Sequence, residues 1–337
     1  SIPGANLSNC VMQRTNLSNS NLKGVNFLNA VLDGAVLDSC DLQNANFGER
    51  PSLSGHTGAV NSLCFASNTE VVSGSNDKKL KVWSLPTKEV LRTIPAHFKK
   101  VNCVLVSKEF IISGSQEGSI KVFNYYTCEA VRVLEGHSDG VNSLSRSKNF
   151  LVSGSRDGLV IVWNWELAEV VHKMQGHKAW VLSVGISKNC VVSGGRDETI
   201  RVWSQGNHLK TLEGHKGWVK SLWVSKDCRF LVSGSKDSTI KIWDFEECVK
   251  TLIGHASCVN VVLLTRDCRF VLSGSKDGTI RIWEFESGNT LKTLCGNKGE
   301  VYALALSKDE KTIVSGGKDK KVTLWDFEAD EAVKTLE

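Results

Sequence analysis

A short turn sequence that recurs seven times constrains this chain of 337 residues more than any other feature. It reads SGSND, SGSQE, SGSRD, SGGRD, SGSKD, SGSKD and SGGKD, and each copy is followed by a strand-like run that ends in an aromatic residue. About 20 residues before each copy stands a histidine or its substitute, at His56, His97, His137, His177, His215, His255 and Asn297. The intervals of 41, 40, 40, 38, 40 and 42 residues indicate one structural unit repeated seven times.

The polar residues that recur in each unit suit a buried hydrogen-bond chain, because mutual pairing removes the cost of burying each group alone. In the third unit they are His137, Ser153, Asp157 and Trp163. Four other units carry the same set, as His56, Ser73, Asp77 and Trp83; His177, Ser193, Asp197 and Trp203; His215, Ser233, Asp237 and Trp243; and His255, Ser273, Asp277 and Trp283.

Two units depart from this set. The seventh has Asn297 in place of histidine, and the second has Glu117 and Phe123 in place of aspartate and tryptophan. Because the second unit lacks the indole donor, we expect it to be the loosest. From residue 55 to the end, the repeats resemble the WD40 family. The resemblance implies an all-β fold, a seven-bladed β-propeller whose blades are four-stranded antiparallel sheets.

The first 49 residues follow a different period, of five residues. A large apolar residue recurs at Leu7, Met12, Leu17, Leu22, Phe27, Leu32, Leu37, Leu42 and Phe47, and a mostly small residue stands two positions before each. Neither helix nor strand periodicity fits this spacing. The segment resembles the pentapeptide-repeat family, which implies a right-handed, four-sided β-helix. Nine units give little more than two coils, so we expect either further coils before Ser1 or support from the propeller.

These periods predict a β-helix over residues 1–49 that is truncated at its N-terminal end, a linker and entry loop over 50–58, and a propeller over 59–337. Two segments compete for the outer strand of the last blade. One is Ser52 to Ser54, just before the first histidine, and the other is the AVKTLE run at residues 332–337. The longer C-terminal run resembles the outer strands of other units, so we expect it to complete the ring.

The cysteine content and the apolar runs of the sequence indicate where in the cell the protein is located. The eleven cysteines form no C-x-x-C pair, which argues against a disulfide framework or a zinc site and favours an intracellular, most simply cytoplasmic, location. The sequence shows no signal peptide and no apolar run long enough to cross a bilayer, so we expect no membrane association. We also expect covalent linkage to upstream domains, since the chain starts without methionine.

Catalytic chemistry finds little support. Six of the eight histidines belong to the repeats, and a Ser/His/Asp set that appears again and again is a structural network. His172 and His208 remain, both in runs that read as outer strands, where a surface histidine needs no special role. The sequence lacks a phosphate-binding P-loop and an H-E-x-x-H motif. We therefore expect no enzyme activity, no cofactor and no metal.

Binding is better supported, because the repeats place comparable residues on one face of the ring, which we call the pole. The residue before the turn acid is Asn76, Gln116, Arg156, Arg196, Lys236, Lys276 or Lys318. The residue before the leading valine of each first strand is Ala59, Lys100, Gly140, Trp180, Trp218, Cys258 or Glu300. The residue after that valine is Asn61, Asn102, Asn142, Leu182, Lys220, Asn260 or Tyr302.

Basic and aromatic residues concentrate at these positions. Residues 51–337 contain 38 Lys and Arg against 32 Asp and Glu, whereas residues 1–50 contain 3 against 4. Such side chains favour carboxylate or phosphate ligands and interface contacts. The candidate partner-binding residues are Lys100, Arg156, Trp180, Arg196, Trp218, Lys220, Lys236, Lys276, Tyr302 and Lys318.

The leading hypothesis is a non-catalytic protein-interaction scaffold whose pole binds an acidic or phosphorylated peptide segment. An alternative is the C-terminal sensor of a larger signalling ATPase, since pentapeptide and WD40 repeats resemble the tails of such proteins. Nucleic-acid binding ranks lower, because it needs aromatic residues along a continuous basic track, and here the two aromatic residues lie on adjacent blades.

Overall fold

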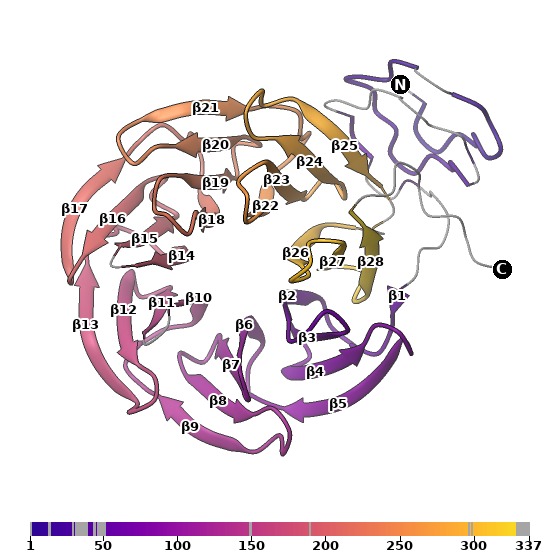
Figure 1. Cartoon of the computed structure of the whole chain (residues 1–337). Helices are drawn as coiled ribbons and strands as arrows, with labels where there is room; N and C mark the ends of the chain where they lie inside the picture. The colour runs from indigo at the N-terminus through magenta and orange to yellow at the C-terminus, as the bar shows by residue number, and fades with distance from the viewer. Residues whose placement is uncertain are drawn as a thin grey trace.

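The computed structural model describes residues 2–12, 15–28, 30, 40–42, 45, 52–147, 150–188, 190–295, 297 and 299–327. Within these ranges, 28 strands form seven four-stranded antiparallel sheets, which stand as blades around a central axis (Figure 1). Six of these sheets are simple meanders of four consecutive strands, and the seventh combines three consecutive strands with β1. The first strands of neighbouring blades contact each other around the axis. The predicted all-β propeller with seven blades is confirmed.

Four blades are built from strands β2 to β17. Blade 1 contains β2 (Val60–Phe65), β3 (Glu70–Ser75), β4 (Lys79–Ser84) and β5 (Glu89–Pro95). Blade 2 contains β6 (Val101–Ser107), β7 (Phe110–Ser115), β8 (Ile120–Asn124) and β9 (Ala130–Leu134). Blade 3 contains β10 (Val141–Arg146), β11 (Leu151–Ser155), β12 (Leu159–Asn164) and β13 (Glu169–Gln175). Blade 4 contains β14 (Val181–Ser187), β15 (Cys190–Gly195), β16 (Ile200–Ser204) and β17 (Asn207–Leu212).

The remaining blades close the ring. Blade 5 contains β18 (Val219–Val224), β19 (Leu231–Ser235), β20 (Ile240–Trp243) and β21 (Cys248–Leu252). Blade 6 contains β22 (Val259–Leu264), β23 (Phe270–Ser275), β24 (Ile280–Glu284) and β25 (Thr290–Leu294). Blade 7 contains β26 (Val301–Leu306), β27 (Thr312–Gly317), β28 (Val322–Asp326) and, as its fourth strand, β1 (Ser52–Leu53).

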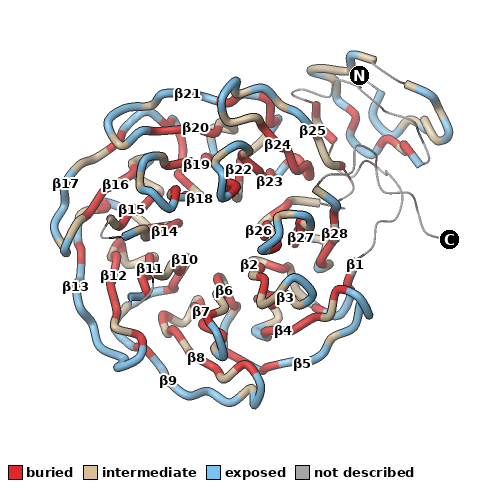
Figure 2. Tube along the Cα trace, in the orientation of Figure 1, coloured by how far each residue is buried: buried red, intermediate tan, exposed pale blue. Residues whose placement is uncertain are grey.

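Burial follows the position of a strand within its blade (Figure 2). All five residues of β11 and of β19 are buried, because a second strand is covered by blades on both faces. Outer strands such as β5 and β13 are mostly exposed. The core therefore lies between blades rather than in one central mass.

A glycine in each second strand sets how closely neighbouring blades approach. A Cβ added at Gly74 would lie 2.7 Å from Cγ1 of Val101, the leading valine of the next blade. The same relation joins blade 7 to blade 1, where a Cβ at Gly316 would lie 2.6 Å from Cγ1 of Val60. These distances are shorter than carbon atoms tolerate, so the recurring glycine leaves the space that the valine fills.

The ring is closed by the N-terminal side of the propeller. Ser52 pairs with Thr323 and Leu53 with Val322, antiparallel to β28. The Leu53 side chain is fully buried in a cluster that includes Phe65 and Trp83 of blade 1. The prediction of a linker over 50–58 and of closure by residues 332–337 is therefore wrong about the strand beside β28. Residues 332–337 themselves lie outside the described residues.

The described part of the N-terminal segment has the geometry of a four-sided coil. Parallel bridges join Asn6 to Asn26 and Asn21 to Asp41, each 20 residues apart, which is four turns of five residues. Leu22 and Phe27 are buried in its interior. Their cluster also contains Cys295, which follows β25, so the coil packs against the rim of the propeller. Figure 1 shows the N-terminal segment beside the end of β25.

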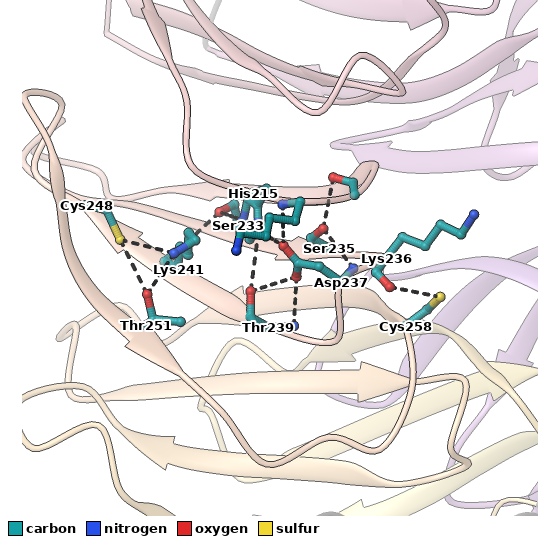
Figure 3. Close-up of polar contacts among 12 residues, drawn as sticks. His215, Ser233, Ser235, Lys236, Asp237, Thr239, Lys241, Cys248, Thr251 and Cys258 are labelled. Carbon is teal, nitrogen blue, oxygen red and sulfur yellow. Dashed lines mark hydrogen bonds and ion pairs between the residues drawn. The ribbon is translucent and has the colours of Figure 1, made fainter.

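The predicted hydrogen-bond chain forms in blades 1, 3, 4, 5 and 6. In blade 5, the indole Nε1 of Trp243 donates to Ser233 Oγ at 2.8 Å, and His215 joins Ser233 Oγ at 2.7 Å and Asp237 at 2.8 Å (Figure 3). Because the indole can only donate, the serine hydroxyl accepts its N–H. Burial alone would raise the pKa of Asp237, but the hydrogen bonds from His215 and Thr239 outweigh it and lower the pKa, so the ionised carboxylate accepts from Nδ1–H of His215.

Two blades use substitutes. In blade 2, the longer Glu117 side chain reaches His97 at 2.7 Å. Burial alone would raise the pKa of Glu117, but the hydrogen bonds from His97 and Ser119 outweigh it and lower the pKa to about 2. In blade 7, Ser315 donates to Asn297 Oδ1 at 2.9 Å, while Asn297 Nδ2 has no partner among the described residues. That blade 2 is the loosest remains a prediction.

We expect acid to weaken the fold through these carboxyl groups. Burial alone would raise the pKa of Asp277, but the interaction with His255 and the hydrogen bonds from Thr279 outweigh it and lower the pKa to about 2. A lowered folded-state pKa gives stability that is present above the ordinary value near 4 and is lost as pH falls toward 2. Asp277→Asn should therefore cost about 2 kcal/mol at neutral pH. It should also flatten the fall in stability between pH 4 and 2.

Urea unfolding followed by tryptophan fluorescence from pH 7 to 2 measures both effects. Glu129→Gln, at an exposed position, is the matched control and should reproduce the wild-type profile. An Asp277→Asn profile parallel to the wild type would show that this carboxyl is not a source of the acid sensitivity.

The closure by β1 gives a second prediction. Leu53→Ala leaves a cavity between blades 7 and 1 and should lower the free energy of unfolding by about 2–4 kcal/mol. Deletion of residues 332–337 should leave it unchanged. Thermal melts of the two variants separate the alternatives, because a deletion more damaging than Leu53→Ala would return ring closure to the C-terminal run.

Candidate functional site

The backbone fixes the pole in the same way in all seven blades. The amide of the residue before each turn acid donates to the carbonyl of the residue before the first strand. Thus Arg196 N bonds Trp180 O at 2.8 Å, and Lys236 N bonds Trp218 O at 2.9 Å. In blades 1 to 6 the turn acid is held by a histidine, and the preceding side chain can point outward, as Figure 3 shows for Lys236.

Five of the predicted residues stack into one continuous ladder across blades 3, 4 and 5. The Arg156 guanidinium lies 4.6 Å from the ring centre of Trp180 on the next blade. Arg196 lies between two indoles, 4.2 Å from Trp180 and 3.7 Å from Trp218. Lys236 Nζ then lies 4.2 Å from Trp218. Cations and aromatic rings therefore alternate, each cation within the range of a cation–π contact.

A pocket of about 530 Å³ opens beside this ladder. Its walls include Arg156, Lys178, Trp180, Arg196 and Trp218. The two indoles and both arginines are half-buried, whereas Lys178 is exposed. His177 and Asp157 also line the pocket, but each already belongs to a buried polar chain. The groups left to meet a ligand are therefore cationic and aromatic.

The ladder is not neutralised by acidic neighbours. Among the described residues, no ion pair involves Arg156, Arg196 or Lys236. Lys178 is likewise on the pole, and its backbone amide binds the ionised Asp197. The positive charge of blades 3 to 5 is therefore open to solvent at the pole.

The blade 7 side of the pole differs. Lys318 forms an ion pair with Glu300 at 3.5 Å. Burial, together with the charge of Glu300 and the hydrogen bond to it, raises the pKa of Tyr302 to about 12. The structure thus gathers Lys318 and Tyr302 around one carboxylate, and it does not place them with the ladder.

The other three predicted lysines occupy separate places. Lys220 donates to Asn260 Oδ1 at 2.8 Å, and its burial lowers the pKa of its amine. Burial and the positive charge of Arg156 lower the pKa of Lys100, which stands directly before β6 of blade 2. Lys276 is exposed on blade 6.

The positions after the leading valines have a structural use that sequence reasoning missed. Asn61 Nδ2 donates to the carbonyl of Val101 on the next blade at 2.7 Å. Asn102, Asn142 and Asn260 make the same contact with Val141, Val181 and Val301. The recurrence of asparagine at one repeat position was the available signal. These four side chains therefore join neighbouring blades.

Catalytic groups do not gather elsewhere in the described part of the chain. His172 and His208 lie on outer strands β13 and β17, as predicted, and His208 bonds Thr211 Oγ1 at 2.9 Å. No group of three or more His, Cys, Asp or Glu side chains in the described ranges could hold a metal ion. No helix among the described residues is long and apolar enough to span a bilayer.

Comparison with known families agrees with this architecture. The WD domain, G-beta repeat family matches residues 49–84, 88–124, 128–164, 168–204, 206–244, 246–284 and 288–326. The family of pentapeptide repeats (8 copies) matches residues 5–48. A search of curated proteins finds no match. Because its seven matched repeats span most of the sequence, the chain belongs to the WD40 family and carries pentapeptide repeats before its propeller.

Proposed function

We propose that the pole binds an acidic or phosphorylated peptide segment, with Arg156, Arg196 and Lys236 as the anion-binding groups and Trp180 and Trp218 as apolar anchors. WD40 propellers are commonly protein-interaction scaffolds and are usually non-catalytic. The single observation that supports the peptide proposal most is the ladder of alternating cations and indoles beside a pocket.

Stacking leaves the arginines ready for a ligand. A guanidinium stacked on an indole uses its face, while its N–H groups lie in its plane and can still donate to an oxygen anion. Two such donors can bind a carboxylate or phosphate side by side. Because Arg196 is held between Trp180 and Trp218, less side-chain entropy is lost when a ligand binds.

The extent of the ladder favours a short peptide over a nucleic acid. The stacked residues occupy blades 3 to 5, and on blade 7 Lys318 is paired with Glu300. A single-stranded nucleic acid needs a longer basic track with aromatic residues along it. A localised cationic arc instead matches one cluster of acidic or phosphorylated residues.

Charge reversal tests the cationic half of the site. The triple variant Arg156→Glu, Arg196→Glu and Lys236→Glu should lose at least about a hundredfold in affinity for acidic peptides, because three charge-assisted contacts become repulsive. Fluorescence anisotropy with labelled hexaglutamate and with a doubly phosphorylated serine peptide measures the affinity. Wild-type binding should weaken as salt rises from 50 to 500 mM.

The matched control reverses three exposed lysines away from the pole, Lys88→Glu, Lys108→Glu and Lys173→Glu. This variant has the same net charge as the pole variant, so it removes long-range attraction without touching the ladder. If both triple variants weaken binding equally, or if neither peptide binds the wild type, the pole is not an acidic-peptide site.

Truncation of an indole tests the aromatic half. Trp218→Ala removes the ring beneath both Arg196 and Lys236 and should weaken peptide binding by about 30-fold, in the range of an interface hot spot. Trp223→Ala, at an indole that is 41% exposed and outside the pole, should leave the affinity within about twofold. Equal losses in the two variants would contradict a specific role for Trp218.

A further inference from the structure

The face opposite the pole carries a second feature that the ladder does not use. In an antiparallel meander, the turn between first and second strands lies at the other end of the blade from the turn between second and third. On this face, blades 5 and 6 have equivalent turns that read KDCRF at residues 226–230 and RDCRF at 266–270. Two neighbouring blades therefore present nearly the same turn sequence, each with two positively charged residues.

At three other junctions between blades, a hydrogen bond joins the adjacent turns on this face. Between blades 4 and 5, Ser187 Oγ donates to Lys226 O at 3.0 Å. Between blades 6 and 7, Glu310 accepts from the amide of Arg266 at 2.8 Å. Between blades 7 and 1, the amide of Lys308 donates to Asn68 at 3.1 Å. In the described residues, no hydrogen bond joins the 226–230 turn to the 266–270 turn.

A pocket of about 590 Å³ opens between these two turns, at the junction of blades 5 and 6. Its lining includes Phe230 and Phe285, whose rings meet edge to face at 5.1 Å. Arg229 of blade 5 and Arg266 of blade 6 stand on its two sides, and both are exposed. The pocket thus combines an aromatic surface with a guanidinium from each of two blades.

Three acidic residues line the pocket: Asp227 and Asp267 are engaged by their own turns, and Glu286 is exposed at its edge towards solvent. Asp227 accepts from Ser225 Oγ at 2.5 Å and from the amide of Arg229 at 3.1 Å. Asp267 is bound in the same way by Thr265 Oγ1 at 2.6 Å and by the amide of Arg269 at 3.0 Å. Lys250 donates to the carbonyl of Phe285 and belongs to the wall. The arginine side chains are therefore the groups best placed to contact an anion.

We propose that this pocket, the lower cleft, is a second binding site that takes an acidic peptide segment through an aromatic side chain that carries or adjoins an anionic group. The ring stacks on Phe230 and Phe285, and the anion lies between Arg229 and Arg266. The lower cleft acts independently of the pole, so this inference does not depend on the proposed function.

Phenyl phosphate is the minimal probe, since it joins a ring to a phosphate. Titrations use the full chain with Arg156→Glu, Arg196→Glu and Lys236→Glu, so that the pole does not contribute, and ligand-observed NMR gives the affinity. In this background, Arg229→Glu or Arg266→Glu should weaken binding by at least about tenfold, because each replaces attraction by repulsion. Inorganic phosphate should bind less tightly than phenyl phosphate, because it lacks the ring.

Repeat symmetry supplies the control. Arg269 occupies in blade 6 the position of Arg229 in blade 5, is exposed, and does not line the cleft. Arg269→Glu should leave binding within about twofold, as surface substitutions outside a site do. Equal effects of Arg229→Glu and Arg269→Glu, or equal affinities for phenyl phosphate and inorganic phosphate, would overturn the proposal.

Discussion

The close approach of neighbouring blades is the constraint on which the whole molecule depends. A leading valine packs against a second-strand glycine of the preceding blade, as Val101 does against Gly74 and Val60 against Gly316. Even one added carbon would lie within 2.7 Å of the valine at either site. Because these contacts run around a closed ring, a shift at one interface changes its neighbours as well. The asparagine contacts from one blade to the next valine carbonyl reinforce the same spacing.

The contacts that hold the blades together leave the side chains of the pole free to differ from blade to blade. Glycine, valine and the buried polar chain hold the backbone, and the turn acid is satisfied by its histidine and by nearby amides. The residue before that acid makes the same backbone hydrogen bond in every blade, whereas its side-chain contacts differ from blade to blade, as in Asn76 with Asn61 and Lys318 with Glu300. Asparagine, glutamine, arginine and lysine all occur there in this chain. Side-chain identity at that position can therefore serve binding without a large cost in stability.

The sequence was sufficient for features that repeat and insufficient for those that occur once. The chain of His215, Ser233 and Asp237 could be predicted, since the same residues return at a fixed interval. The closure by Leu53 could not, because a strand of two residues has no periodicity and its anchor is a slot between blades 7 and 1, which are far apart in the sequence. Nor could spacing show that Glu300 pairs with Lys318 while Arg196 stacks between indoles. Those outcomes depend on side-chain positions across blades.

Blade 5 contributes to both candidate sites, with Trp218 and Lys236 at the pole and Arg229 and Phe230 in the lower cleft. Strands of about six residues separate the two faces by about 20 Å. Coupling between the sites would require blade 5 to move as a unit, since its interior is closely packed. Such movement is opposed by the glycine–valine contacts on both of its sides, at Gly194 with Val219 and at Gly234 with Val259. The fold therefore favours independent action of the two proposed sites.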